Sequence, residues 1–458
     1  MKKVTNLKKK LSISTTHVIM MSFLTVILVG SFLLWLPISH KNGVSVSYLD
    51  SLFMSTTSTC VTGLVTLVTS ETWSVFGQII ILILIQIGGL GVITIFAGVL
   101  VFLHKKIRLK DSQLIQDSFN INDNAGVRGF VKKVIIGSLT IELIGAILYL
   151  FVFVPDFGAK GIWISIFTAI SAFCNAGIDI IGNVSLIDYA TNPLVNFTTS
   201  LLIILGGLGF IVWWDLIRVA KLFKTRGLKC FKSLTLHSKL VLLITLILIF
   251  VGGLGVFIFE YNNPLTIANY GLFDKIQISL FQSITTRTAG FASIPQENLT
   301  NTSSIICLLL MIIGGSPVGT AGGIKTVTFV VLIISAISTI KNKNDNVIFN
   351  RTLPKEAPKK ALAILSMFLL IVIVSTFLLS IAVKDRSLLD ILYETVSASA
   401  TVGLSRNLTP YLNGFGKIII IVTMYLGRVG PISLAVAFNV ERKIENIVKC
   451  PTEDIRIG

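Results

Sequence analysis

Four short segments of this sequence could bind a cation, because each consists mostly of small or hydroxylated residues and ends in glycine. Their glycines are separated by 114, 113 and 113 residues. Backbone carbonyl groups that line water can replace the hydration shell of an ion, and glycine reaches the necessary backbone angles without a Cβ atom in the path. Any one glycine would equally suit a tight turn between helices, but four at one period favour a cation filter. The segments are Thr59-Cys60-Val61-Thr62-Gly63, Phe173-Cys174-Asn175-Ala176-Gly177, Thr286-Arg287-Thr288-Ala289-Gly290 and Ser399-Ala400-Thr401-Val402-Gly403.

The composition places these segments in a membrane. Hydrophobic residues make up 53% of the chain, charged residues make up 13%, and the mean hydropathy is +0.85. Such a chain is too apolar for a soluble globular protein of 458 residues, so the lipid bilayer is its expected surroundings. The net charge of +17 does not indicate nucleic acid as a partner, because Lys and Arg of membrane proteins gather in cytoplasmic loops. Five cysteines without metal-binding spacing predict neither a zinc site nor a disulfide framework.

The apolar runs predict an all-α membrane protein of four tandem copies around a pseudo-four-fold pore. Each copy has a spanning helix, a short pore helix, the glycine segment and a second spanning helix. The expected boundaries are 1–104, 105–225, 226–341 and 342–440, followed by a cytoplasmic tail at 441–458. Eight spans are expected at 17–38, 73–103, 131–154, 194–219, 236–259, 304–340, 361–383 and 416–440, and four pore helices at 47–58, 162–172, 272–285 and 388–399. The first run resembles a signal peptide, but it has spanning length and is expected to be retained.

Charge supports this topology independently of hydropathy. The two termini and the connections between copies contain 29 of the 39 Lys and Arg residues, which predicts that both termini are cytoplasmic. The opposite side contains 8 basic and 11 acidic residues. The filter is therefore expected to open outward under a net negative mouth, which would concentrate cations.

The sequence resembles the Trk/Ktr/HKT potassium transporter superfamily, and most closely its KtrB-type membrane subunits. The resemblance covers nearly the whole chain and includes the filter glycines, the string Thr285-Thr286-Arg287-Thr288-Ala289-Gly290-Phe291 and the glycine-rich run from 314 to 325. It implies potassium uptake through a selective, gated, channel-like pore with potassium at the filter carbonyls. Gly63 implies the potassium-selective type, since some relatives with serine there favour sodium. Ile178-Asp179 departs from the aromatic residue that usually follows the second glycine, so the outer mouth of that copy is uncertain.

The resemblance also implies partners and a location. It implies a homodimer with one pore per protomer, a cytosolic regulatory ring of nucleotide-binding subunits similar to KtrA or KtrC, and the bacterial plasma membrane. No covalently bound cofactor is expected, and the candidate bound ions are potassium and sodium. The sequence leaves open whether sodium is co-transported or only activates.

The second span of the third copy is expected to break in mid-membrane. Five glycines and one proline lie between 314 and 323, and proline alone costs about 3 kcal/mol in a helix interior. Irregular backbone at this depth must face protein or water, so the segment is placed just below the filter, and the resemblance implies that it gates the pore. A helix-packing face is the alternative, which suits Gly88-Gly89-Leu90-Gly91 and Gly206-Gly207-Leu208-Gly209 better. The gating residues assigned here are Gly314, Gly315, Ser316, Pro317, Gly319, Gly322, Gly323 and Lys325.

Two arginines fall at membrane depth. Arg428 follows Gly403 by 25 residues, as Gly315 follows Gly290, so it is expected beside the broken helix. A charge there costs about 2.5–3.5 kcal/mol and normally faces a cavity or a partner; the resemblance implies that Arg428 presses on the gating loop, and a structural anchor is the alternative. Arg287 would repel an ion inside the filter, so it is expected to point behind the filter and to pair with an acidic neighbour. Glu142 remains without an assigned role.

Three functions compete at this point: a potassium-conducting pore, a secondary transporter and a membrane-embedded enzyme. The four copies share one topology instead of alternating, which argues against inverted repeats. The sequence contains no His-Glu-x-x-His or Gly-x-Ser-x-Gly motif, and its four histidines are scattered, so no enzyme activity is expected.

Overall fold

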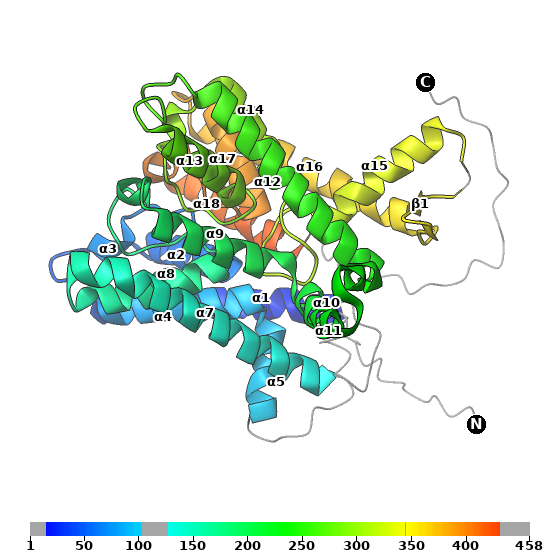
Figure 1. Cartoon of the computed structure of the whole chain (residues 1–458). Helices are drawn as coiled ribbons and strands as arrows, with labels where there is room; N and C mark the ends of the chain where they lie inside the picture. The colour runs from blue at the N-terminus through cyan, green and yellow to red at the C-terminus, as the bar shows by residue number, and fades with distance from the viewer. Residues whose placement is uncertain (1–14, 103–126, 344, 431–458) are drawn as a thin grey trace, which may run out of the picture.

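The computed structural model describes residues 15–102, 127–343 and 345–430, and these residues are mostly helical. The lysine-rich start, the basic stretch after residue 103 and the tail at 441–458 lie outside the described residues. The described helices form four tandem copies of one unit, as predicted (Figure 1). The boundaries assigned between the copies stay a prediction.

The first helix and the pore helix of every copy lie where the apolar runs predict them. The first helices are α1 (Thr15–Trp35), α7 (Val127–Phe157), α12 (Leu236–Glu260) and α16 (Ala357–Ala382). All four are long and apolar enough to cross a membrane. The pore helices are α2 (Tyr48–Cys60), α8 (Lys160–Phe173), α13 (Leu272–Thr285) and α17 (Leu388–Ala400).

Local chemistry fixes the start of two pore helices. Ser47 and Ser387 cap α2 and α17, because each serine hydroxyl accepts a hydrogen bond from the backbone N–H three residues later. The carboxylates of those residues, Asp50 and Asp390, accept a hydrogen bond from the hydroxyl of Ser47 and of Ser387 respectively. A carboxylate in the first turn also suits the positive end of the helix dipole.

The second helix is interrupted in each of the first three copies, which the sequence predicted only for the third. The pairs α4 (Val75–Leu90) with α5 (Val92–Phe102) and α9 (Pro193–Leu208) with α10 (Phe210–Lys221) each bend by 99°. In the third copy α14 (Asn301–Ile312) and α15 (Thr326–Ile340) are separate helices. In the fourth, α18 (Gly414–Val429) ends before Gly430, whose φ is 93°.

The prediction of one continuous helix at 73–103 and another at 194–219 is therefore wrong. The bends occur at Gly91 and Gly209, both with a φ of 87°, a conformation that side chains with a Cβ rarely adopt. These two glycine runs consequently break their helices, whereas the sequence favoured a packing face for them. Figure 1 shows α5, which follows the bend at Gly91, pointing away from α4.

The remaining elements are short. A two-stranded antiparallel hairpin, β1 (Val347–Ile348) and β2 (Arg351–Thr352), departs from the all-α prediction without altering the fold. The other short helices are α3 (Thr69–Thr72), α11 (Phe223–Arg226), η1 (Pro37–Ser39), η2 (Ile187–Tyr189), η3 (Gly227–Ser233), η4 (Gln296–Asn298) and η5 (Thr409–Tyr411).

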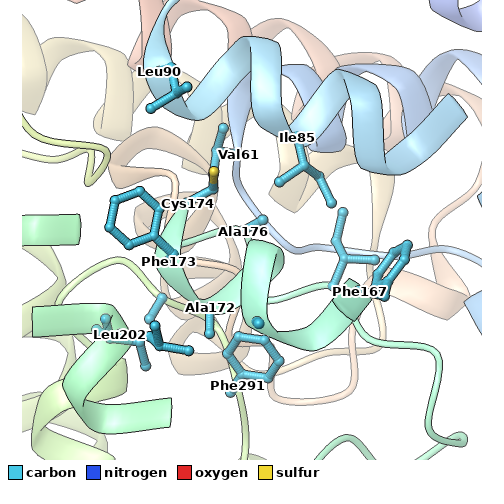
Figure 2. Close-up of a cluster of buried hydrophobic side chains, with 14 of the residues drawn as sticks. Val61, Ile85, Leu90, Phe167, Ala172, Phe173, Cys174, Ala176, Leu202 and Phe291 are labelled. Atoms are coloured by element: carbon cyan, nitrogen blue, oxygen red, sulfur yellow. The ribbon is translucent and has the colours of Figure 1, made fainter. Parts of the chain in front are cut away.

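The apolar core surrounds the glycine segments. Figure 2 shows Cys174 and Ala176 of the second segment enclosed by side chains of α4, α8 and α9, and by Phe291 of the third copy. Large hydrophobic residues on the long helices, such as Phe250 and Phe377, are instead about two-thirds exposed. This inverted distribution is what a lipid-facing surface requires, because lipid tails are as apolar as the core.

Candidate functional site

The four glycine segments adopt one backbone conformation. Each glycine has a positive φ, at 101°, 64°, 83° and 99° for Gly63, Gly177, Gly290 and Gly403. The residue two positions earlier in each segment is not glycine, yet it also has a positive φ; these residues are Val61, Asn175, Thr288 and Thr401, at 55°, 60°, 69° and 52°. Such residues cost about 1–3 kcal/mol each and cluster at functional sites. Alternating left-handed and right-handed residues turn successive carbonyls toward the same side of the chain.

The glycines meet in a closed ring. A Cβ added to Gly63 would lie 2.6 Å from the carbonyl oxygen of Ala176, and one added to Gly177 would lie 2.5 Å from that of Ala289. A Cβ added to Gly290 would lie 2.5 Å from the carbonyl oxygen of Val402, and one added to Gly403 would collide with the carbonyl oxygen of Thr62. Every copy thus contacts the carbonyl group of the next, and the fourth contacts the first. The predicted convergence of Thr62, Ala176, Ala289 and Val402 on one axis is therefore present in the structure.

Hydroxyl groups behind the ring hold the strained backbone, and the sequence analysis missed them. The N–H of Gly63 donates to the Thr57 hydroxyl and that of Gly403 donates to the Ser397 hydroxyl, each at 3.0 Å. The Ser171 hydroxyl donates to the carbonyl of Ile178 at 2.6 Å. Thr57, Ser171 and Ser397 each precede their glycine by six residues. This common spacing is the signal that could have revealed them.

Replacing Thr57 by valine is expected to reduce ion selectivity without unfolding the protein. Valine keeps the shape of threonine but leaves the buried N–H of Gly63 without an acceptor, at a cost of about 1–3 kcal/mol. The potassium-to-sodium flux ratio of reconstituted protein should fall several-fold. The matched control is Thr25→Val, because Thr25 is exposed on α1 and donates only to the carbonyl of Met21. An unchanged ratio in Thr57→Val would show that this hydroxyl does not support the ring.

The residue three positions before each glycine has its side chain behind the ring. It holds Cys60, Cys174, Arg287 and Ala400, all buried. The Arg287 guanidinium faces the Thr245 hydroxyl at 3.5 Å and the Gly314 carbonyl at 3.4 Å. The guanidinium therefore lies between α12 and the backbone of Gly314, and among the described residues it forms no ion pair with a carboxylate. The expected acidic partner is thus replaced by the carbonyl of the segment below the filter.

One ion pair and the hydrogen bonds of an arginine fasten the fourth copy to the first and third copies. Lys417 donates to Asp50 of the first copy at 2.5 Å. Arg406 pairs with Asp390 at 2.8 Å and also donates to the carbonyls of Gln296 and Glu297 in the third copy. Burial raises the pKa of Asp50, but hydrogen bonds from Lys417, Ser47 and Thr66 together lower it by a larger amount. The pKa of Asp50 therefore lies below its ordinary value.

The interruption between α14 and α15 is a segment, residues 313–325, that lies beneath the ring. The N–H groups of Ser316 and Thr320 donate to the carbonyls of Gly207 and Gly206, at 2.9 and 3.1 Å. The Thr320 hydroxyl donates to Phe173, the first residue of the second glycine segment. The N–H of Gly322 donates to the Thr288 hydroxyl at 3.0 Å. The predicted break is confirmed, and the segment is attached to the underside of the glycine segments.

Close packing explains the small residues of this segment. Gly314 lies against Gly322 and Gly323, so the two ends of the segment lie side by side, and Ile313 and Ile324 form a parallel bridge. Hydrogen bonds between Gly314 and Ile324, and between Ile324 and Ile312, close it at 3.0 Å each. A Cβ on Gly319 would lie 2.9 Å from the carbonyl oxygen of Gly206. A Cβ on Gly315 would lie 3.0 Å from the carbonyl oxygen of Gly207. The carbonyl oxygen of Pro317 in turn lies 2.5 Å from the position of a Cβ on Gly209.

Arg428 lies beside this segment, as the spacing predicted. Its guanidinium donates to the carbonyl of Thr320 at 2.7 Å and to the carbonyl of Gly88. Lys325 is nearby and donates to the carbonyl of Ala321 at 2.6 Å. Both cations line a cavity of about 270 Å³ together with Gly319 and Ala321. Positive charge therefore gathers on the face of the segment opposite to the filter.

Glycines of the second helices also contact the start of the glycine segments. A Cβ added to Gly88, Gly206 or Gly427 would collide with the carbonyl of Thr59, Phe173 or Ser399 respectively. Those three residues all lie four positions before their filter glycine. The glycine-rich runs at 88–91 and 206–209 therefore both break the helix and admit the filter backbone. The repeated string Gly-Gly-Leu-Gly was the available signal for this.

Comparison with known proteins gives the same fold and places the chain in a family. A family model described as "TrkH: Cation transport protein" matches residues 3–449. The Ktr system potassium uptake protein B of Bacillus subtilis is 40% identical over 92% of both chains. The potassium/sodium uptake protein NtpJ of Enterococcus hirae is 37% identical over 99% of this chain and 100% of that protein.

A solved structure supports the architecture. The potassium transporter TrkH from Vibrio parahaemolyticus superimposes with a TM-score of 0.74 at 16% identity, covering 93% of this chain and 86% of that one. At this identity the likeness concerns the fold alone. Together with the match of the family model over nearly the whole sequence, it shows that this chain is a membrane protein of the TrkH family of cation transport proteins, which is not an enzyme family.

Proposed function

We propose that the protein takes up potassium across the plasma membrane through a selective, gated, channel-like pore. The ring of four glycines that face four carbonyl groups carries the proposal, because it provides the unobstructed carbonyl lining that replaces the hydration shell of an ion. The names of the relatives from B. subtilis and E. hirae, which mention potassium and sodium, support the choice of ion. In this proposal potassium is coordinated by backbone carbonyls of the glycine segments, at residues 59–63, 174–177, 287–290 and 400–403.

The segment below the ring is the gate in this proposal. Residues 314–325 occupy the space between the glycine ring and the cavity that contains Arg428 and Lys325, so an ion that leaves the filter meets this backbone next. Hydrogen bonds to the second, third and fourth copies hold the segment in place. Only these few hydrogen bonds must break for the segment to move. A gate that opens and closes requires such a small barrier.

The proposal includes partners and orientation. Two relatives are named as protein B of a Ktr system, and this supports a multi-component assembly. We therefore expect a homodimer that binds a cytosolic ring of nucleotide-binding subunits similar to KtrA or KtrC. The membrane is the bacterial plasma membrane, with both chain ends in the cytoplasm, because the basic connections lie on that side.

Flux through purified protein in liposomes tests the proposal. Vesicles loaded with potassium chloride should accumulate external rubidium-86 without any imposed sodium or proton gradient, because a pore needs only the gradient of its own ion. Empty liposomes are the control. Equal sodium on both sides should raise the flux if sodium only activates. Uptake that requires an imposed sodium or proton gradient would overturn the channel-like mechanism and favour a coupled transporter.

A further inference from the structure

The outer mouth of the glycine ring is a cavity of about 170 Å³ that contains the four filter glycines and the residues that follow them. The position two residues after each glycine lines this cavity in all four copies. These residues are Val65, Asp179, Ala292 and Ser405, and all four are half-buried. Among the described residues that line the cavity, Asp179 is the only charged one. A single carboxylate therefore lies on the ring of side chains directly outside the filter.

Asp179 is held in a fixed position by its own loop. Its Oδ1 atom accepts a hydrogen bond from the N–H of Ile181 at 3.2 Å, and the carboxylate also accepts from Ser185 and from the N–H of Gly182. Ser185 in turn accepts a hydrogen bond from Ala292, at the equivalent position of the third copy. These bonds leave a charge without a cationic partner among the described residues.

The charge is present under ordinary conditions. Burial raises the pKa of Asp179 by more than its hydrogen bonds lower it, and the resulting pKa is about 6. The group is therefore ionised at pH 7.5, where transport assays are run. An unpaired carboxylate in a small cavity enclosed by protein exerts a stronger field than one on an open surface, because the low-dielectric walls focus it.

We propose that Asp179 forms an external cation site at the filter mouth, which concentrates hydrated potassium before the ion exchanges its water for carbonyl groups. The inference rests on the proposed function and adds the residue that sets the apparent affinity for external potassium. The charge acts on ion capture and not on the choice between ions, because a carboxylate outside the ring attracts all small cations. Selectivity consequently stays with the glycine ring.

Neutralising this residue separates its charge from its role in the loop. Asp179→Asn keeps the oxygen that accepts from Ile181 but removes the charge. We expect the apparent KM for external potassium, measured as rubidium-86 uptake into proteoliposomes at pH 7.5, to rise by about 3- to 10-fold. The maximal rate and the potassium-to-sodium flux ratio should stay as in the wild type. The matched control is Asp188→Asn, because Asp188 belongs to the same connection and is exposed, but does not line the cavity.

Relocating the charge provides a decisive second variant. Val65 occupies the equivalent position in the first copy, so Val65→Asp in the Asp179→Asn background returns a carboxylate to the same ring. This double variant should recover most of the lost affinity. Recovery cannot result from repair of the loop at 179–185, because the new carboxylate lies in another copy.

Several outcomes would overturn the inference. An unchanged KM in active Asp179→Asn protein would do so, and so would a double variant as impaired as the single one. If Asp179→Asn fails to reconstitute, wild-type protein still provides the test: impermeant salt should raise its KM by screening the carboxylate, and a KM independent of salt contradicts the site. Wild-type protein without any uptake would instead contradict the proposed function itself.

Discussion

Replacing Gly63 by serine is expected to lower the potassium-to-sodium flux ratio by about tenfold, which corresponds to about 1.4 kcal/mol. The φ of Gly63 is 101°, and an added Cβ would lie 2.6 Å from the carbonyl oxygen of Ala176, so the backbone of the first segment or its neighbour must shift. Either shift breaks the even spacing of carbonyl groups around the ring. Flux ratios from proteoliposomes with purified protein would measure the change.

Gly43→Ser is the matched control for this prediction. Gly43 also has a positive φ, at 83°, but nothing lies within 4 Å of the position of an added Cβ. The control therefore carries comparable backbone strain in the same copy without contact to the ring, and its flux ratio should equal that of the wild type. If both variants lose selectivity equally, strain alone is responsible, and the first copy does not line the filter.

Removing the charge of Arg428 is expected to raise the resting potassium flux several-fold. A guanidinium remains protonated in proteins, and two unit charges 4 Å apart interact by roughly 4 kcal/mol at an effective dielectric near 20. The group also latches the gate, because it joins the carbonyl of Thr320 to that of Gly88. Arg428→Ala removes both the repulsion and the latch, and flux measured in liposomes without regulatory subunits should show the increase.

Arg428→Lys should give an intermediate flux, because lysine keeps the charge but cannot reach two carbonyls with a planar fork. Arg351→Ala serves as a control for loss of an arginine, since Arg351 is exposed on β2 and does not line the cavity. A lower flux together with misfolding of Arg428→Ala would identify a structural anchor and refute the gate assignment.

The sequence predicts the positions of the pore helices and of the glycine segments that follow them well, because the chemistry of these elements is local. The spacing of four glycines and the short apolar run before each of them place Gly63 and its counterparts correctly. The pore helix from Leu272 to Thr285 has the bounds that its apolar run indicates. Interactions within about fifteen residues decide these features, so a single sequence contains the necessary information.

The bends at Gly91 and Gly209 illustrate what the sequence does not reveal. Glycine costs only about 1 kcal/mol in a helix, so without proline the same run is compatible with a straight helix. Packing decides the matter, because Gly88 and Gly206 admit the carbonyls of Thr59 and Phe173, and those contacts form only when different parts of the chain assemble. The partner of Arg287 escaped prediction for the same reason, since the carbonyl of Gly314 comes close only after the third copy folds.

The closed ring of glycine and carbonyl contacts has a consequence for how this protein can change. In a channel built from four identical chains, one substitution alters all four walls of the filter at once. Here Gly63, Gly177, Gly290 and Gly403 belong to one chain and are encoded separately. A mutation therefore alters one quarter of the filter and leaves three quarters intact. Ion preference can therefore change by small amounts through single substitutions. Each of the four segments can also be followed by a different side chain, as the second is followed by Asp179.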